Sequence, residues 1–449
     1  MVEAPNMIVM KFGGTSVGSA ENIARVALII KKAIESHPIV VVSAVTKMTD
    51  ALILLAEESS QGGGEHTFNR IKTTHGNIVS ELNLPPALLH DEFEELTSLV
   101  EATRHNLSLD KKVRDHFQSF GERMCAKIVA AMLNKDRIAS KAFPAWEIGM
   151  ITNDEFGDAE PLPESYAVIK KEIALLDVIP VVTGFIGKTK KGEITTLGRG
   201  GSDYSAAVIG SAVGAARIQI WKEVDGFLTT DPRIVPEAKI VPELAFEEAC
   251  ELAYFGAKVL HPKTIIPAME KDIPVQVLNT FNPDGEGTTI VGNFSQRRLK
   301  SHSIEALTLK KAVIVVHIHT PEFFDNNGLM AQVFNTFDKH KTNIDIIATS
   351  VASISLAITD DSNLEEIVRE LEDVGTVEIE RRKAVICAVG GSINAAGVAG
   401  RMFTVLGDNQ IAVEMISQAS SGYSITFVVK DESAEWALRI LHAEYFRHS

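Results

Sequence analysis

Residues Ile8–Ser16 read IVMKFGGTS, an apolar run followed by two glycines and two hydroxyl residues. The apolar part, Ile8–Phe12, predicts a buried β-strand. Two glycines directly after a strand let the backbone approach a ligand closely, so their N–H groups could face a phosphate. Lys11 would add a point charge, and Thr15 and Ser16 would add hydroxyl donors. The Walker A spacing GxxxxGK[ST] is absent, and an ordinary turn is the alternative for this segment taken alone.

Apolar runs of the same kind alternate with helical patterns over the first two thirds of the chain. Strands are predicted at Ile8–Phe12, Ile39–Ser43, Pro180–Phe185, Ile218–Val224 and Ile273–Leu278. Continuous Val and Ile runs are typical of strands that are buried on both faces. Helices are predicted at Ala20–Ile34, Leu244–Phe255 and Thr264–Lys271. The fold class is therefore α/β, with a layered, mostly parallel sheet and helices on both of its faces.

Two features divide the chain further. A charged, helix-prone stretch at about 64–135 predicts a helical insertion, and a Gly-, Asn-, Ser- and Arg-rich stretch at Gly285–Arg298 predicts a linker. Beyond it the chain repeats, since Ala312-Val-Ile-Val-Val aligns with Ala384-Val-Ile-Cys-Ala. Each repeat predicts strand, helix, strand, strand. We expect one domain at 1–297 and an α+β region at 298–449 with units at about 312–383 and 384–449. A strand at 303–310 could belong to the second unit.

Composition excludes several classes of protein. The net charge is −15 over 449 residues, which argues against non-specific binding of nucleic acid. The sequence contains no run of 18 or more apolar residues, so no membrane-spanning helix is predicted. The N-terminus lacks the basic region and the following apolar run of a signal peptide. Cys125, Cys250 and Cys387 are isolated, which fits a reducing compartment. These observations predict a cytoplasmic protein that binds neither nucleic acid nor membrane.

A second glycine-rich segment, TTLGRGGSD at Thr195–Asp203, surrounds Arg199 with glycines just before a helical pattern. A helix N-terminus with an arginine fork suits a carboxylate or a phosphate. Other segments add polar groups near predicted strand or helix ends: SAVTKMT at 43, FGE at 120, TTDPR at 229 and FGAKVLHP at 255. Ligands of open α/β sheets bind at the carboxyl ends of the strands. For Glu122 and Lys258 taken singly, a solvated surface charge is the alternative.

Six segments in this order resemble the aspartate kinases of the amino-acid-kinase superfamily: KFGGTS, SFGE, TNDEFGDAEP, TTLGRGGSD, TTDPR and FGAKVLHP. The helical stretch at 64–135 and the single-function length resemble the lysine-sensitive monofunctional bacterial type most. The tail repeat resembles a pair of ACT regulatory domains. The resemblance implies transfer of a phosphoryl group from ATP, with Mg2+, to the side-chain carboxylate of L-aspartate. The product would be 4-phospho-L-aspartate, at the first step of lysine, threonine, methionine and diaminopimelate biosynthesis.

The resemblance also implies roles for individual residues. Three would be catalytic: Lys11, Asp203 and Lys258. Seven would bind aspartate, with Glu122 on its ammonium and Arg199 on its α-carboxylate: Ser43, Thr49, Glu122, Arg199, Gly200, Gly201 and Ser202. Nine would bind ATP: Lys11, Gly13, Gly14, Lys222, Glu223, Leu228, Arg233, Lys258 and Val259. No protein ligand to a metal is assigned.

One departure from the family pattern concerns the nucleotide. The usual Trp-Thr-Asp-Val reads Trp221-Lys-Glu-Val224 here, so we expect altered nucleotide affinity. The chemistry itself needs no general base, because an aspartate side chain with a pKa near 3.9 is already ionised at neutral pH. Catalysis would then rest on positioning and on the positive charge of Lys11, Lys258 and Mg2+.

In the family the first ACT unit binds an inhibitory amino acid. The matching candidates are Asn326, Gly328, Met330, Asn343, Ile344, Asp345, Thr349 and Ser350. Asp345 could pair with a lysine ammonium, which favours lysine over threonine as effector; a carboxylate that caps a turn is the alternative. Exposed strand edges of such units predict a homodimer, with a tetramer as the larger alternative.

Two other functions stay open at this point. A related kinase could act on glutamate, acetylglutamate or UMP. An amino-acid sensor without phosphoryl transfer is the non-enzyme alternative, and Lys222-Glu223 is its only support in the sequence.

Overall fold

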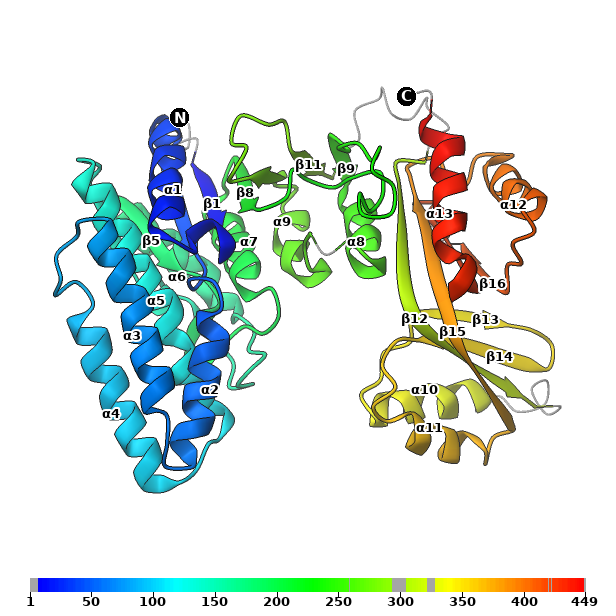
Figure 1. Ribbon diagram of the computed structural model, residues 1–449, viewed down its shortest axis with the longest axis horizontal. Helices are drawn as coiled ribbons and strands as arrows, with labels where there is room; N and C mark the ends of the chain where they lie inside the picture. Colours follow the sequence, from blue (N-terminus) through cyan, green and yellow to red (C-terminus); the bar gives the residue numbers. More distant parts are fainter. Residues whose placement is uncertain are drawn as a thin grey trace. The chain divides into compact units, whose positions relative to one another are not determined.

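The structure is a computed structural model that describes residues 7–257, 259–292, 304–320, 328–418, 420 and 422–447 (Figure 1). Contacts divide the chain into two compact units. Within the described residues, the first unit holds those up to 292 except 228–241 and 247–257. The second unit holds these two stretches and the residues from 304 onward.

The first unit is built on an eight-stranded sheet in the order β3-β5-β2-β1-β8-β10-β11-β9. Its strands are β1 (Ile8–Phe12), β2 (Pro38–Val42), β3 (Ser140–Phe143), β5 (Ile179–Thr183), β8 (Arg217–Lys222), β9 (Glu243–Ala245), β10 (Val275–Asn279) and β11 (Thr288–Val291). Every pairing is parallel except that between β10 and β11. All five residues of β1 and of β2 are buried. The predicted mostly parallel α/β sheet is therefore confirmed, and the five predicted strands fall within two residues of observed ones.

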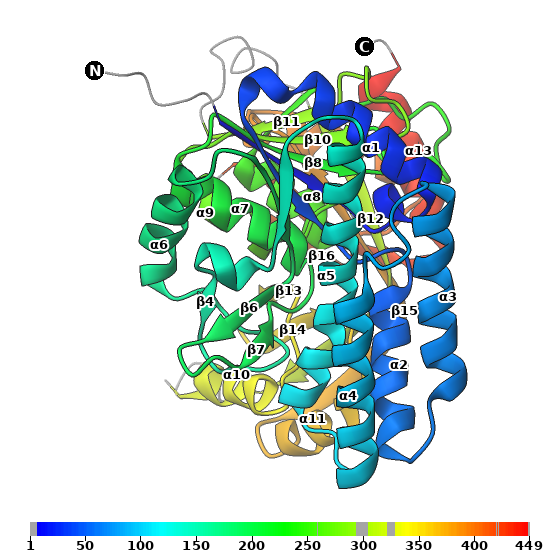
Figure 2. The same ribbon diagram turned by 90° about the vertical axis from the view of Figure 1, so that its left-hand side faces the viewer.

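Helices cover both faces of this sheet (Figure 2). They are α1 (Ala20–Lys32), α2 (Met48–Ser60), α3 (Glu65–Glu81), α4 (His90–Asn106), α5 (Lys111–Lys135), α6 (Pro163–Ala174), α7 (Gly201–Val213) and α9 (Ile266–Met269). Alternate residues of a strand point to opposite faces. Ile8, Met10 and Phe12 of β1 accordingly share a core with α1, α2 and α5. Val9 lies on the other face, towards Gly210 of α7, where an added Cβ would come within 2.6 Å of Ile218.

The predicted helical insertion corresponds to α3, α4 and α5. A small sheet of β4 (Ile151–Thr152), β6 (Ile186–Thr189) and β7 (Ile194–Thr196) leads into the glycine-rich segment before α7. Two helix predictions were wrong in detail. Leu244 and Ala245 belong to β9, so helix α8 begins only at Phe246 and ends at Phe255. The pattern from Thr264 divides into a 3-10 helix, Pro262–Ile265, and the short α9.

The second unit contains an antiparallel six-stranded sheet in the order β13-β14-β12-β15-β17-β16. The first repeat comprises β12 (Ala306–His319), α10 (Leu329–Lys339), β13 (Ile346–Thr349), β14 (Ser353–Ile358) and α11 (Leu364–Leu371). The second comprises β15 (Thr376–Val389), α12 (Val398–Asp408), β16 (Met415–Gln418), β17 (Ser424–Lys430) and α13 (Asp431–Phe446). The predicted order of strand, helix, strand, strand is present in both repeats, and a further helix follows each.

Strand β12 serves both repeats. Residues Val313–His319 pair with the first half of β15, whereas Ala306–Lys310 pair with Val385–Val389 in its second half. The register shifts between these two stretches. The stretch at 306–310 thus lies against the strand of the second repeat, which is the arrangement that the sequence left open.

Two segments that precede the predicted linker pack with the second unit. The Thr229 hydroxyl lies 2.9 Å from Nε2 of His442, and the Thr229 carbonyl accepts a hydrogen bond from the Leu307 N–H. At Gly256, just after α8, a Cβ would come within 2.9 Å of the Leu309 carbonyl oxygen. The contacts therefore divide the chain differently from a boundary at residue 297.

Candidate active site

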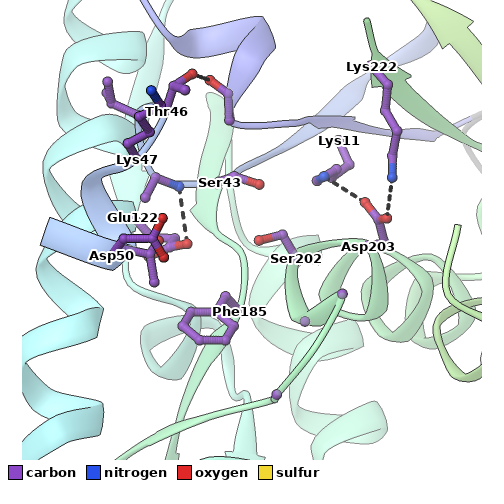
Figure 3. Close-up of a pocket in the computed structure, with 17 residues that line it drawn as sticks. Lys11, Ser43, Thr46, Lys47, Asp50, Glu122, Phe185, Ser202, Asp203 and Lys222 are labelled. Carbon is purple, nitrogen blue, oxygen red and sulfur yellow. Dashed lines mark hydrogen bonds and ion pairs between the residues drawn. The ribbon is translucent and has the colours of Figure 1, made fainter. Parts of the chain in front are cut away.

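A pocket opens at the carboxyl ends of β1 and β2 and beside the start of α7 (Figure 3). It has a volume of about 430 Å³. Its lining residues come from six separate stretches of the first unit: Lys11, Gly14, Ser43, Ala44, Val45, Thr46, Lys47, Thr49, Asp50, Glu122, Phe185, Gly198, Gly200, Gly201, Ser202, Asp203 and Lys222. The location agrees with the rule that ligands of α/β sheets bind at the carboxyl ends of the strands.

One wall of the pocket holds two lysines around a single carboxylate. Lys11 Nζ lies 2.6 Å from Asp203 Oδ1, and Lys222 Nζ lies 2.9 Å from Asp203 Oδ2. Burial alone would raise the pKa of Asp203, but the two ammonium groups attract its charge and hold the pKa below its ordinary value. The cluster therefore carries one positive charge in excess, which suits a pocket that receives phosphate.

Lys222 has a second partner that the sequence does not indicate. Its ammonium also donates to the carbonyl oxygen of Val259 at 2.6 Å. Strand β8 brings Lys222 beside Lys11, because the two strands pair in parallel with Lys11 opposite Ile220. Glu223, the next residue, is exposed.

The opposite side of the pocket contains a buried carboxyl group. Glu122 lies on α5 and is 3% exposed, and its Oε1 accepts the Ala44 N–H at 3.1 Å. Its Oε2 has no hydrogen-bond partner among the described residues. Burial raises the pKa of Glu122 to about 8. A buried oxygen that lacks a donor is costly, so the pocket favours a ligand with a positively charged donor at this point.

The two glycines after β1 differ in what they do. The Gly13 N–H donates to the Trp221 carbonyl at 3.0 Å, so the expectation that it faces a phosphate was wrong. The Ser16 hydroxyl is also used internally, with Thr280 Oγ1 at 2.7 Å and the Trp221 carbonyl at 3.2 Å. Gly14 lines the pocket, and a Cβ there would come within 3.1 Å of the Ala44 carbonyl oxygen.

The TTLGRGGSD segment contributes its glycines, Ser202 and Asp203 to the pocket, but not its arginine. Gly198 and Gly200 have φ values of 71° and 72°, a backbone conformation that glycine adopts without strain. Arg199 between them is exposed and does not line the pocket. Ser43 and Thr49 do line it.

Several predicted residues lie elsewhere. Lys258 and Asn326 fall outside the described residues. Leu228 and Arg233 belong to the second unit, where Arg233 Nη2 pairs with Asp231 Oδ2 at 2.6 Å. Val259 belongs to the first unit.

Sequence reasoning did not assign seven residues that line the pocket: Ala44, Val45, Thr46, Lys47, Asp50, Phe185 and Gly198. Lys47 and Phe185 have positive φ values, 64° and 67°, which are uncommon for such side chains and cluster at functional sites. In the sequence, only neighbouring glycines or hydroxyl residues indicated these positions. A positive φ at a lysine or a phenylalanine cannot be recognised from the residue type.

The candidate effector residues centre on Asp345, whose side chain is 3% exposed. Its Oδ2 lies 2.9 Å from Lys310 Nζ and accepts the Thr359 hydroxyl at 3.2 Å. Its Oδ1 accepts the Tyr254 hydroxyl of α8 at 2.8 Å. Asp345 is therefore the acceptor of an ion-pair network, and the alternative of a simple turn cap does not describe it.

Among the described residues no group of three or more His, Cys, Asp or Glu is placed to hold a metal ion. In the same part of the chain, no helix has both the length and the apolar character that a membrane crossing needs.

Comparison with known proteins identifies the family. Residues 6–279 match the amino acid kinase family and residues 386–445 match an ACT domain. The chain is 34% identical over 460 residues to lysine-sensitive aspartokinase 3 of Escherichia coli, covering 98% of this chain and 99% of that protein. It is 38% identical over 457 residues to the chloroplastic aspartokinase 1 of Arabidopsis thaliana, covering 98% and 80%.

Solved structures agree. Aspartokinase III of Escherichia coli in complex with aspartate and ADP, described as the R-state, superposes with a TM-score of 0.82 and 33% identity over 98% of this chain and 100% of that one. The same enzyme with lysine and aspartate, described as the T-state, gives the same values. Aspartate kinase of Clostridium acetobutylicum gives a TM-score of 0.84 at 26% identity over the same shares. The chain belongs to the aspartokinases of the amino acid kinase family and carries an ACT regulatory region.

Proposed function

We propose that this pocket binds L-aspartate and the phosphates of ATP and transfers the γ-phosphoryl group to the side-chain carboxylate. The observation that carries the proposal is the pairing of opposite features across one pocket. A cluster with excess positive charge, Lys11–Asp203–Lys222, faces a carboxyl group, Glu122, with an unpartnered oxygen. The first suits phosphate and the second suits the ammonium of an amino acid.

Aspartate would bind with its ammonium on Glu122 and its polar groups near Ser43, Thr49 and Ser202, which all line the pocket. The Gly200 and Gly201 backbone at the start of α7 would receive a carboxylate, since a helix N-terminus favours negative charge. Arg199 stays a prediction for the α-carboxylate, and that role requires its exposed side chain to turn inward.

The reaction would be a direct displacement. The ionised aspartate carboxylate attacks the γ-phosphorus, an O–P bond forms, and ADP leaves as the bond to its β-phosphate oxygen breaks. No proton has to be removed from the nucleophile. Lys11 and Lys222 would reduce the repulsion between carboxylate and triphosphate. Asp203 would hold both ammonium groups in place until phosphate arrives.

Mg2+ fits this site as a companion of ATP. Mg2+ usually keeps several waters and binds through one or two carboxylates plus substrate phosphates, so it needs no protein cage. Asp50, exposed at the pocket, and Asp203 are the carboxylates that could reach it. Its chemistry would be to neutralise charge on the phosphate oxygens.

The remaining nucleotide contacts are predictions. Gly14, Glu223, Leu228, Arg233, Lys258 and Val259 stay candidates for ATP. Gly13 could contribute only close backbone approach, because its N–H already has a partner.

We further propose that lysine is the inhibitory amino acid and that its ammonium binds Asp345. Support comes from Lys310, which already places a lysine ammonium against this carboxylate. Threonine has an α-ammonium but no side-chain ammonium. Gly328, Met330, Asn343, Ile344, Thr349 and Ser350 stay candidates around it, together with Asn326. The homodimer, the larger assembly and the cytoplasmic location also stay predictions, as do the domain boundaries.

A substrate panel tests the catalytic proposal. Production of ADP should depend on L-aspartate, and hydroxylamine should trap the acyl phosphate as a hydroxamate. Glutamate, acetylglutamate and UMP should each give at most a few per cent of that rate. Turnover that does not depend on aspartate would favour one of the related kinases. No turnover with any of these substrates would favour the amino-acid sensor.

A further inference from the structure

A buried carboxylate outside the pocket joins three segments that are far apart in the sequence. Asp115 lies in the second turn of α5 and is 1% exposed. Its Oδ2 accepts the backbone N–H groups of Gly157 and Thr196, each at 2.9 Å. Its Oδ1 accepts the Thr196 hydroxyl, also at 2.9 Å. Asp115 does not line the pocket.

These three hydrogen bonds are strong ones. Each has an ionised acceptor, and such bonds are roughly twice as strong as neutral ones. Burial keeps water from competing for the same oxygens. Asp115 therefore fixes Thr196 and Gly157 against helix α5 more firmly than packing alone would.

Thr196 is the last residue of β7, and the chain passes from it directly into the pocket wall. Gly198 and Gly200 to Asp203 all line the pocket. The Leu197 N–H donates to the Phe185 carbonyl, and Phe185 lines the pocket as well. The position of Thr196 thus sets where this wall begins.

Gly157 brings a second loop to the same place. The Ala159 N–H donates to the Thr196 carbonyl at 2.8 Å. A Cβ on Gly198 would come within 2.3 Å of Asp158 Oδ1, so the two segments touch at the glycine that starts the wall. Asp115 holds both segments at once.

Helix α5 also carries the opposite side of the pocket. Glu122 follows Asp115 by seven residues, or about two helical turns, so both side chains leave the same face of α5. One helix thus presents Glu122 to the pocket and, two turns earlier, anchors the wall that faces it.

We propose that Asp115 is a positioning residue for aspartate binding, which sets the distance between Glu122 and the wall at 197–203. The inference rests on the proposed function, because it takes Glu122 and this wall to be the aspartate site. Asp115 itself touches no substrate. Its effect would fall on aspartate more than on ATP, since Lys11 and Lys222 lie on β1 and β8, which Asp115 does not contact, and Asp203 at the end of the wall stays paired with both ammonium groups.

Three variants test the proposal, with KM for aspartate, KM for ATP, kcat and the thermal midpoint measured for each. Asp115→Ala removes all three bonds and should raise KM for aspartate about tenfold or more, leaving KM for ATP within about twofold. Asp115→Asn should keep KM for aspartate within about threefold, because an amide oxygen can accept both N–H groups while its nitrogen donates to the Thr196 hydroxyl. Thr196→Val removes one bond and should give an intermediate rise.

Asp110→Ala is the matched control. Asp110 caps the same helix by accepting the Val113 N–H at 2.7 Å, so its loss weakens α5 without touching either loop. It should lower the thermal midpoint and leave KM for aspartate unchanged. If Asp115→Ala does not fold, Asp115→Asn and Thr196→Val still decide the matter.

Three results would overturn the inference: an unchanged KM for aspartate in Asp115→Ala, an Asn variant as impaired as the Ala variant, or an equal rise in Asp110→Ala. Glu122→Gln separates this failure from that of the proposed function. If Glu122→Gln raises KM for aspartate while Asp115→Ala does not, only the role of Asp115 falls. If neither does, the aspartate site itself is wrongly placed.

Discussion

The charge of the pocket depends on a few residues whose protonation the fold controls. Asp203 is shared between Lys11 and Lys222, so an incoming phosphate meets a carboxylate that already has two cations. Phosphate can bind one of these ammonium groups without leaving Asp203 unpaired, because the other ammonium group can keep its ion pair with Asp203. A single buried ion pair would not allow this, since removing one partner leaves an uncompensated buried charge.

Substitution of Lys11 tests this arrangement. Lys11→Ala should lower kcat about 100-fold or more, by analogy with the loss of one donor to a developing charge. The thermal midpoint should change little if Lys222 keeps Asp203 paired. Lys112→Ala removes an exposed lysine paired with Glu193 and serves as control. Near-normal turnover in Lys11→Ala would remove Lys11 from the mechanism.

Glu122 predicts a pH dependence of aspartate binding. Its pKa of about 8 lies above its ordinary value, so near neutral pH the free enzyme holds a proton there that the unfolded chain does not. Bound ammonium favours the carboxylate and lowers this pKa, so binding releases the proton. KM for aspartate should therefore rise as pH falls from about 8.5 to about 6, by up to about tenfold per unit.

The same proton also makes the stability of the folded protein depend on pH. As pH rises, aspartate binding should improve, whereas the stability contributed by Glu122 should fall. A carboxyl whose pKa is raised on folding contributes stability at low pH that is lost as pH rises towards about 8. Glu122→Gln should abolish the pH dependence of KM and bind aspartate weakly at every pH. A flat KM profile in the unmodified enzyme would contradict the assignment of Glu122 to the ammonium.

Among elements, the strands were the most predictable and the segment boundaries the least. The apolar runs of β1 and β2 indicate strands because strands buried on both faces are almost continuously apolar, and Lys11 is the one polar side chain in the two runs. Leu244 and Ala245 fit an apolar helical stripe as well as a strand, and only the pairing of β9 with β11 distinguishes the two. That pairing joins residues more than 40 positions apart, so no local pattern contains it.

The candidate site shows the same limit. Motif order alone assembled Glu122, Ser202 and Asp203, which do line one pocket. The partner of the Gly13 N–H could not be predicted, since it depends on the neighbouring strand β8. Asp115 was missed because no motif marks it. Its importance comes from contacts with residues 42 and 81 positions away.

Lys310 of β12 leads to a prediction about effector binding in the first ACT repeat. Lys310 holds Asp345, so a lysine effector must displace it to reach the carboxylate. Lys310→Met should therefore lower the Kd for lysine about tenfold, because a buried carboxylate without a cation gains more from a new one. Isothermal titration calorimetry measures this directly.

Lys311→Met is the matched control, since Lys311 is the next residue of the same strand and pairs instead with Glu435 near the surface. It should leave the Kd for lysine unchanged. A weaker Kd in Lys310→Met would mean that Lys310 helps to hold the effector and does not compete with it.

On the scale of the whole molecule, the contacts suggest how an effector could influence the site. Helix α8 packs within the second unit, where its Tyr254 donates to Asp345. The fourth residue after the end of α8 is Val259, whose carbonyl accepts a hydrogen bond from the Lys222 ammonium. An effector that binds Asp345 would compete with the Tyr254 hydroxyl. The backbone links helix α8, which carries Tyr254, to Val259, which accepts from Lys222.

This connection predicts a coupling that must be reciprocal. If lysine weakens aspartate binding by some factor, then aspartate must weaken lysine binding by the same factor, because both describe one coupling free energy. Roughly 1–3 kcal/mol, or about 5- to 150-fold, is typical of such couplings. Calorimetric titration of lysine with and without saturating aspartate and ADP, and of aspartate with and without lysine, should give ratios of Kd values that agree within experimental error.

Tyr254→Phe should shrink both ratios together while Asp345→Ala abolishes lysine binding. Inhibition by lysine with no change in either Kd would show that the effector acts on turnover alone, and the proposed path through α8 to substrate binding would be wrong.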